Sequence, residues 1–251
     1  MVDAGGCSPS LPQRNRCTLH IVHAARLLDP PPLPAAKAAV MEMDHHTLSL
    51  TIEGLAAERG GRVVVAGLAF SLSPGEALTL RGANGTGKTS ILRAVAGFSD
   101  PAEGTVRFDL SGEEADASET RATAIHWLGG DDALADKLTL KESLSFWSSL
   151  LGGGATDELP ARLGLSGLED TPLGKMSTGQ RRRAGIGRLL CAPRPLWLLD
   201  EPMSGLDDQG RELLLSIIAE HRATGGILLM ASHDEGIPGC PVLRLSPAVA
   251  A

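Results

Sequence analysis

Aromatic and basic residues are scarce in this sequence. Tyrosine is absent, aromatic residues make up 3% of the 251 positions, and 23 Lys and Arg stand against 30 Asp and Glu, for a formal charge of −7. A nucleic-acid groove needs a basic surface and aromatic rings on which bases stack. The composition therefore argues against nucleic acid as a partner.

Long apolar runs and paired cysteines are also missing. The longest stretch without a charged residue is Ser143–Thr156, where half of the positions are Ser or Gly, whereas a membrane-spanning helix needs about 20 mostly apolar residues. The four cysteines, Cys7, Cys17, Cys191 and Cys240, show no C-x-x-C spacing, which argues against a zinc site or a disulfide framework. We expect a protein without a membrane span, in a reducing, cytosolic compartment.

The residues that are present suffice for one globular domain. Hydrophobic residues reach 43%, close to the globular average, and the length fits one domain, or one domain with an appendage. Residues 1–42 contain a proline run at 30–34 and no sustained periodicity. They are either a disordered tail or a segment ahead of a biological start at Met41 or Met43, and they lack the features of an export signal. Residues 43–251 are expected to form a single domain.

Strand and helix signals alternate along that domain. Leu48, Leu50 and Ile52 alternate as one face of a half-buried strand, and together with short strands at 63–65 and 77–80 they predict antiparallel pairing. The expected order then is helix 89–96, strand 124–128, helices 141–151 and 178–190, strand 196–199, helix 207–221 and strand 227–231. Such alternation is typical of a parallel sheet covered on both faces, so the predicted fold class is α/β.

A glycine-rich segment directly follows the strand at 77–80 and fits the phosphate-binding pattern G-x-x-x-x-G-K-[ST]. Its glycines let successive backbone N–H groups point at a phosphate, and the next helix adds the positive end of its dipole. The Lys88 ammonium is expected to contact the β- and γ-phosphates, and the Thr89 hydroxyl to hold Mg²⁺. The predicted nucleotide-binding residues are Gly82, Ala83, Asn84, Gly85, Thr86, Gly87, Lys88, Thr89 and Ser90.

Two carboxylates end the apolar strand at 196–199. Continuous apolar runs are typical of buried parallel strands, and ligands bind beyond the carboxyl ends of such strands. Asp200 and Glu201 are therefore expected beside the phosphate loop. There Asp200 would support Mg²⁺ and Glu201 would act as the general base on the attacking water. Taken alone, an acidic strand end is more often a helix or turn cap.

Three further segments carry a family resemblance. Met176-Ser177-Thr178-Gly179-Gln180 resembles the L-S-G-G-Q signature of ATP-binding cassette (ABC) proteins, the segment from Ser204 to Asp207 is similar to the loop after the catalytic Glu, and His233 matches the switch histidine. The resemblance covers residues ~47–246. It implies a P-loop NTPase three-layer sandwich of ABC type, with a small antiparallel β subdomain and an inserted helical subdomain at about 132–189. It also implies ATP and Mg²⁺ as cofactors, and Glu201 and His233 as catalytic residues.

The resemblance further implies a head-to-tail dimer. Ser177 is expected to cap a helix whose free N–H groups can face a γ-phosphate. In the family that phosphate belongs to the second copy, so Ser177 and Gly179 are predicted to close on the ATP held by Lys88 of the other chain. Gln180 and Asp207 are also predicted to bind the nucleotide. The run Arg181-Arg182-Arg183 just after the signature is predicted to be a solvated helix face.

Two positions depart from the family pattern. Gly130 stands where a Gln usually meets the helical subdomain, and no glycine side chain can reach Mg²⁺; Asp131 or Asp132 is a possible substitute. The adenine-stacking aromatic is also missing. Arg59 is either its replacement, stacking through its guanidinium plane, or a solvated turn residue.

Softer motifs indicate a subfamily. The segments 58–62, 67–70 and 219–226 look most similar to the ATP-binding subunit of the haem exporter of bacterial cytochrome c maturation. This resemblance implies membrane permease subunits of a maturation complex as partners and a peripheral location at the cytoplasmic face of the inner membrane. Direct haem binding is not expected, because no C-x-x-C-H motif is present and the histidines, including His45 and His46, are predicted to lie in the extension or the ATP site. The alternatives are the ATPase of another ABC exporter or importer and, less favoured, a soluble ABC-type ATPase.

Overall fold

The computed structural model describes residues 48–130, 134–233 and 236–246, all of which belong to the larger of two compact units, Val40–Ala251. The predictions for the extension at 1–42, for the adjacent His45 and His46, and for Asp131 and Asp132 lie outside the described residues. Among the described residues, no helix has the length and apolar character required to cross a bilayer.

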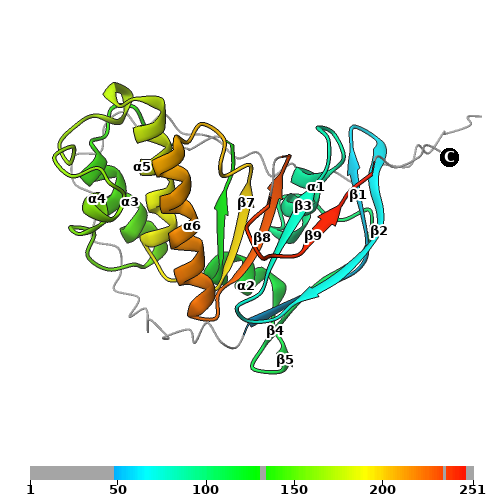
Figure 1. The fold of residues 1–251 in the computed structure, drawn as a ribbon. Helices are drawn as coiled ribbons and strands as arrows, with labels where there is room; N and C mark the ends of the chain where they lie inside the picture. Colours follow the sequence, from blue (N-terminus) through cyan, green and yellow to red (C-terminus); the bar gives the residue numbers. More distant parts are fainter. Residues whose placement is uncertain (1–47, 131–133, 234–235, 247–251) are drawn as a thin grey trace, which may run out of the picture. The chain divides into compact units, whose positions relative to one another are not determined.

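A four-stranded antiparallel sheet forms one side of this unit (Figure 1). Its order is β2 (Arg62–Leu72), β1 (Leu48–Arg59), β4 (Glu103–Leu110) and β5 (Glu113–Glu114). The alternation predicted for β1 is confirmed, because Leu48, Leu50 and Ile52 are all buried. Gly60 and Gly61 join β1 to β2, and both have positive φ angles, as the tight two-residue turn of a hairpin requires.

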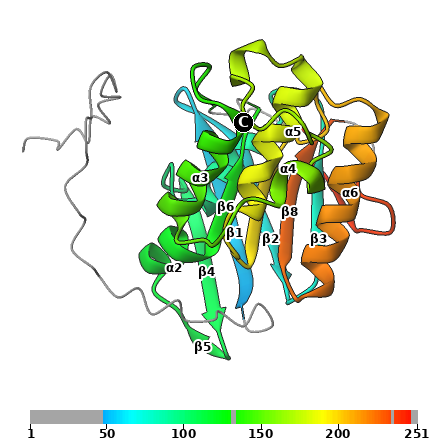
Figure 2. The ribbon, with the colours of Figure 1, turned by 90° about the vertical axis from the view of Figure 1, so that its left-hand side faces the viewer.

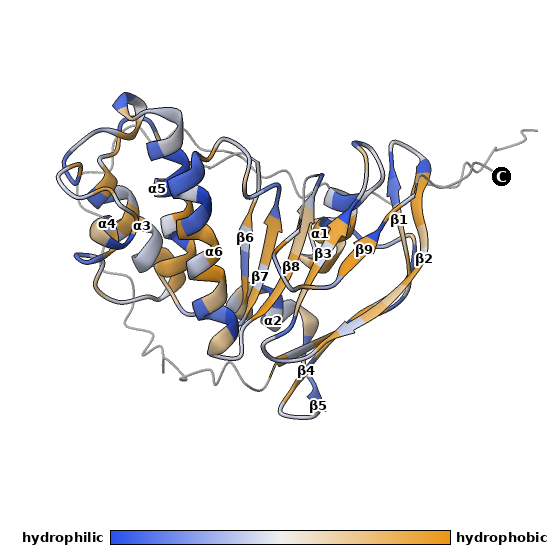
Figure 3. Cartoon of the chain, viewed as in Figure 1, coloured by the Kyte–Doolittle hydropathy of each residue, from blue (hydrophilic) through white to orange (hydrophobic). Residues whose placement is uncertain are grey.

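A five-stranded sheet forms the centre of the unit. Its order is β6 (Ile125–Leu128), β7 (Leu196–Asp200), β8 (Ile227–Ser232), β3 (Ala77–Arg81) and β9 (Val242–Arg244), and every pairing is parallel. The prediction that 77–80 pairs antiparallel with the first strands is therefore wrong. The first four residues of β3 are buried in succession, the pattern of a strand covered on both faces. In Figure 3 β7 and β8 are correspondingly hydrophobic.

Helices cover both faces of the central sheet. On one side α1 (Lys88–Val95) packs in a core shared with the antiparallel sheet, and on the other lie α3 (Leu140–Leu151), α4 (Leu159–Arg162), α5 (Thr178–Leu190) and α6 (Asp208–Ala223). Figure 2 looks onto this second group of helices. Alternate residues of β7 face the two layers, Leu198 toward α1 and Trp197 toward α6. The α/β sandwich with its antiparallel subdomain is confirmed.

Some elements carried no signal strong enough to predict. The helix α2 (Ala117–Ala124) buries only Thr120 and Ala124, so it lacks an apolar stripe, and β4, β5 and β9 were not expected either. The short η2 turn (Leu173–Lys175) precedes α5.

The prediction that all histidines lie in the extension or the ATP site is also wrong. His126 on β6 and His221 on α6 are buried beside Trp197, whose ring stacks on the His221 ring at 3.8 Å. Both rings have a polar partner within the core. Nε2 of His126 lies 2.8 Å from the Ala192 carbonyl oxygen, and Nε2 of His221 lies 3.3 Å from the Ile227 carbonyl oxygen.

Candidate functional site

The glycine-rich loop connects β3 to α1, as predicted. Gly87 forms the N-cap of α1 with a φ of 92°, and no side chain caps the helix. The first turn of α1 contains no acidic residue. The N-terminal N–H groups of a helix need partners and attract anions, so this helix end is suited to a phosphate.

The loop is packed too tightly for larger residues. A Cβ added to Gly87 would lie 2.4 Å from a methyl carbon of Val65 and 3.1 Å from one of Val64. A Cβ on Gly82 would lie 2.6 Å from the Thr86 hydroxyl oxygen. Both glycines are therefore required by close packing, and the β1–β2 hairpin is held directly against the loop.

Lys88 extends back across the same loop. Its side chain is 6% exposed, and its ammonium donates to the carbonyl oxygens of Gly82 at 2.7 Å and Ala83 at 3.3 Å. A carboxylate oxygen of Glu201 lies 3.7 Å from the same nitrogen. The cation is thus fixed over the loop where a phosphate would enter.

Asp200 stands at the carboxyl end of β7, within reach of Thr89. Burial raises the pKa of its carboxyl group, while a hydrogen bond from the Thr89 side chain acts in the opposite direction. Its Oδ1 is buried and has no hydrogen-bond partner among the described residues. A buried carboxylate oxygen left open beside a hydroxyl is a donor set that suits Mg²⁺, so the residues present fit the predicted cation.

Glu201 has an unusual backbone conformation. Its φ of 49° lies in the left-handed region, which costs about 1–2 kcal/mol for a residue with a side chain. Its N–H donates to Ala231 at 2.9 Å, and its carboxylate Oε2 lies 2.7 Å from Nδ1 of His233. Strain of this kind is common at functional sites, where surrounding contacts hold it.

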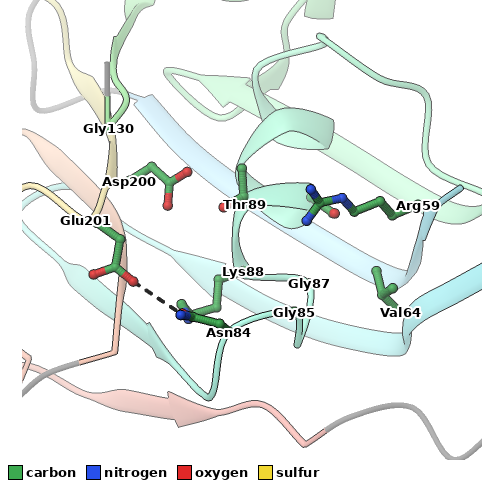
Figure 4. Close-up of a pocket in the computed structure, with 11 residues that line it drawn as sticks. Arg59, Val64, Asn84, Gly85, Gly87, Lys88, Thr89, Gly130, Asp200 and Glu201 are labelled. Atoms are coloured by element: carbon green, nitrogen blue, oxygen red, sulfur yellow. Dashed lines mark ion pairs between the residues drawn. The ribbon is translucent and has the colours of Figure 1, made fainter. Parts of the chain in front are cut away.

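These side chains border one pocket of about 260 Å³ (Figure 4). Asp200 and Glu201 lie on one side, Lys88 and Asn84 in the middle, and Arg59 on the other side with Val64. His233, Gly82 and Ala83 line a neighbouring pocket, and Thr86 is a buried residue of the loop. The complete lining is Arg59, Val64, Asn84, Gly85, Gly87, Lys88, Thr89, Ser90, Gly130, Asp200 and Glu201.

Both positions that depart from the family pattern, Gly130 and Arg59, border this pocket. The stacking of Arg59 on a base stays a prediction.

The signature residues form a separate group. Ser177 caps α5: its hydroxyl accepts from the Gln180 N–H at 3.2 Å, and the Gln180 side chain accepts from the Ser177 N–H at 3.0 Å. Asp207 caps α6, and its carboxylate is 3.8 Å from the place of a Cβ on Gly179. None of these four residues lines the pocket of their own chain.

The prediction of a solvated arginine face after the signature is wrong for two of the three residues. Arg182 and Arg183 are 4% and 8% exposed, whereas Arg181 is half-buried and pairs with Asp136 at 2.5 Å. Among the described residues, the Arg182 guanidinium donates to the carbonyl oxygens of Gly129, Glu201 and Pro202. No sequence signal distinguishes this arginine from its neighbours, because its partners are backbone atoms distant in the chain.

Comparisons with known proteins agree with this geometry. The family model described as ABC transporter matches residues 65–204. The cytochrome c biogenesis ATP-binding export protein CcmA of Paramagnetospirillum magneticum is 44% identical over 205 residues, which cover 78% of this chain and 94% of that protein. The CcmA of Rhodopseudomonas palustris is 47% identical over 188 residues, covering 74% and 92%.

A solved structure described as the ATP binding subunit of an ABC transporter has a TM-score of 0.64 and 26% identity, over 72% of this chain and 78% of its own. Because the family model spans more than half of the chain and the relatives are matched over nearly their whole length, this chain belongs to the ABC transporter family as an ATP-binding subunit of the CcmA type.

Proposed function

We propose that the chain binds Mg-ATP in the pocket between Arg59 and Glu201 and hydrolyses it to drive export of haem for cytochrome c biogenesis. The observation that carries the nucleotide part is the convergence of three groups: the uncapped N-terminus of α1, the buried Lys88 ammonium and the open Asp200 carboxylate. Together they offer donors and a cation to a triphosphate and oxygen ligands to a metal.

The proposed roles follow from the contacts. Lys88 binds the β- and γ-phosphates, while Thr89 and Asp200 hold Mg²⁺, which neutralises charge on the phosphate oxygens when bound. Glu201 accepts a proton from the attacking water. His233, 2.7 Å from the Glu201 carboxylate, orients that carboxylate. The remaining loop residues bind through backbone N–H groups.

We further propose that two copies assemble head to tail. Ser177, Gly179, Gln180 and Asp207 lie together at the starts of α5 and α6 but do not border their own pocket. The positive end of α5 is suited to an anion, and the resemblance to ABC cassettes supports the γ-phosphate held by the second copy as that anion.

The transport role rests on the relatives, whose printed names describe ATP-binding export proteins of cytochrome c biogenesis. By this proposal the chain works with the permease subunits of a maturation complex at the cytoplasmic face of the inner membrane and does not bind haem itself. His126 and His221 support the last point, because both rings are enclosed in the core and engaged by backbone carbonyls.

A surface rich in aromatic residues is the proposed docking site for a permease subunit. We call Phe98, Trp127, Phe146 and Trp147 the aromatic belt. Phe98 packs on Trp127, Phe146 packs on Trp147, and Arg188 joins the pairs by donating to the Trp127 carbonyl while lying over the Trp147 ring. Phe98 and Phe146 are more than half exposed, as is Leu150 one turn beyond Phe146. Enrichment in aromatic residues and arginine is typical of interface cores.

The belt also lies close to the pocket, since Trp127 is three residues before Gly130, which lines it. A permease subunit bound there would thus contact the strand that leads into the nucleotide site.

A gene-replacement experiment tests the proposed function. A strain that carries Lys88→Ala in place of the wild-type chain should lose covalently bound haem from its c-type cytochromes and keep its b-type haem proteins, as seen by haem staining of membrane and periplasmic fractions. Normal c-type cytochromes would contradict haem export and leave another ABC exporter or importer as the function. Fractionation of the chain with the inner membrane only when the permease subunits are present tests the partner, and a Phe146→Ser variant tests the belt.

A further inference from the structure

Three consecutive arginines of α5 have three different targets. Arg181 pairs with Asp136 and donates to the Leu134 carbonyl, in the segment before α3. Arg183 donates to the Gly164 carbonyl just after α4. Only Arg182 is directed at the central sheet and the pocket. The second turn of α5 is therefore fastened to the helical region by two arginines and to the nucleotide site by one.

The contacts of Arg182 converge on the two backbone segments that border the pocket from this side. One guanidinium nitrogen donates to the Gly129 carbonyl at 3.1 Å, directly before Gly130. The other donates to the Glu201 carbonyl at 3.2 Å and to that of Pro202 at 3.4 Å. A planar guanidinium has several donors in a fixed arrangement, so one side chain fixes the spacing of both segments.

The Glu201 carbonyl belongs to the strained residue of the site. Its left-handed φ directs the carboxylate toward Lys88 and His233, and a relaxed backbone would direct it elsewhere. The Ala231 carbonyl holds the N–H side of this residue at 2.9 Å. Arg182 and the Ser204 N–H hold its carbonyl side. Charged hydrogen bonds of this kind offset the cost of the strain.

We propose that Arg182 is a positioning residue that fixes the Glu201 backbone, and with it the general-base carboxylate, to the signature helix α5. This inference rests on the proposed function of Glu201. Gly130 has no side chain with which to join the helical region to the nucleotide site. Within the described part of the chain Arg182 makes such a link, so that a shift of α5 reaches the Gly129 and Glu201 carbonyls through one buried guanidinium.

Arg183 provides a matched control. It lies next to Arg182 on the same helix, is almost equally buried, and also donates to a backbone carbonyl, but that carbonyl is remote from the pocket. The full-length chain is compared as Arg182→Gln, Arg182→Lys and Arg183→Gln. The measurements are kcat for ATP hydrolysis at saturating Mg-ATP, the Kd of a fluorescent ATP analogue, and the thermal unfolding midpoint.

Loss of a charged hydrogen bond to the backbone of the general-base residue is expected to lower kcat of Arg182→Gln about 10- to 100-fold, with Kd within about threefold of wild type. Arg182→Lys should be intermediate, because an ammonium keeps the charge but not the planar set of donors. Arg183→Gln should keep kcat within about threefold of the wild type, even if its thermal unfolding midpoint falls as far as that of Arg182→Gln.

Two results would overturn the proposal. One is a wild-type kcat in Arg182→Gln. The other is an equal loss of kcat in Arg182→Gln and Arg183→Gln, which would show a structural role only. If Arg182→Gln does not fold, Arg182→Lys decides on the same criteria. Failure of the proposed function looks different, since Glu201→Gln would then keep its turnover.

Discussion

The two ends of β7 bury polar groups for different purposes. At its carboxyl end Asp200 borders a pocket and leaves one carboxylate oxygen without a partner among the described residues. Three residues earlier Trp197 stacks on His221 and lies edge-on to His126, its neighbour in the β6–β7 register. The indole N–H of Trp197 also lacks a partner among the described residues, but two imidazole rings flank it.

The pKa values of the buried groups at the two ends are also shifted in opposite directions. Burial raises the pKa of Asp200 and lowers that of His126 to about 3, because in both cases it disfavours the charged form. A cation can compensate the charge of Asp200 from the pocket. The ring of His126, packed against protein, has no such access. Changes at the carboxyl end should therefore alter nucleotide chemistry, and changes at the other end should alter stability.

The largest effect on nucleotide affinity is expected for Lys88→Ala. Removing the cation over the loop should lower the affinity for Mg-ATP by about a hundredfold or more, with little change in the fold. Calorimetric titration of the folded variant measures this. Lys141→Ala removes an exposed lysine from α3 and should bind as the wild type does. Equal affinities in both variants would refute the role of the loop.

Glu201→Gln should separate hydrolysis from binding. Loss of a general base lowers kcat about 10²- to 10⁴-fold, whereas the contacts of Lys88 with the phosphates remain. Phosphate release and sedimentation with ATP are the measurements, and the variant should accumulate as a closed dimer. Glu220→Gln, which changes an exposed carboxylate on α6, is the control. A variant that turns over at the wild-type rate would exclude Glu201 as the base.

Gly226→Ala should disturb the other end of β7. The added Cβ would lie 2.1 Å from the His221 ring, so the ring must leave its stack on Trp197. Overpacking of this kind costs about 1–3 kcal/mol of unfolding free energy. Gly154 has open space around its Cβ position and no positive φ, so Gly154→Ala should unfold at the wild-type denaturant concentration. Nucleotide affinity should stay the same in both; a large loss in Gly226→Ala would contradict the separation of the two ends.

The smallest effect concerns pH. His126 in the unfolded chain binds a proton below about pH 6.5, whereas in the folded chain its pKa is about 3. The contribution of the neutral His126 ring to the free energy of unfolding is therefore fully present above pH 6.5. It is lost as the pH falls, by up to about 1.4 kcal/mol per pH unit. Denaturant unfolding measures the free energy of unfolding at pH 7 and at pH 5. The loss of this free energy between pH 7 and pH 5 should be smaller in His126→Gln than in the wild type. An identical difference would assign the acid sensitivity to other groups.

The sequence predicted the parts whose signal is local. The loop from Gly82 to Ser90 and the apolar strand before Asp200 combine residue type with position. Most residues of the loop, together with Asp200 and Glu201 after the strand, border the pocket. Alternation of apolar residues predicted β1. For β3, the four consecutive buried positions are typical of a parallel strand, but the prediction of antiparallel pairing followed its position directly after the first strands.

What escaped prediction depends on partners distant in the chain. A run of three arginines predicts a charged, exposed helix face. Arg182 is nevertheless buried, because its guanidinium finds hydrogen-bond partners in the Gly129 and Glu201 carbonyl oxygens. His126 and His221 were placed in the wrong region for the same reason, since only the folded chain brings them to Trp197. The helix α2 had too few apolar positions to show a period.

The cap of α5 has one more consequence, which concerns the direction of a single hydrogen atom. The Ser177 oxygen accepts from the Gln180 N–H, so a lone pair is engaged and the hydroxyl hydrogen remains available to donate outward. A carboxylate would cap the helix as well as a hydroxyl does, but it has no hydrogen to donate and would repel a phosphate. By the proposed function, a hydroxyl at this position would therefore let the helix keep its cap while it binds an anion, and closure around a nucleotide would not need to unwind the first turn of α5.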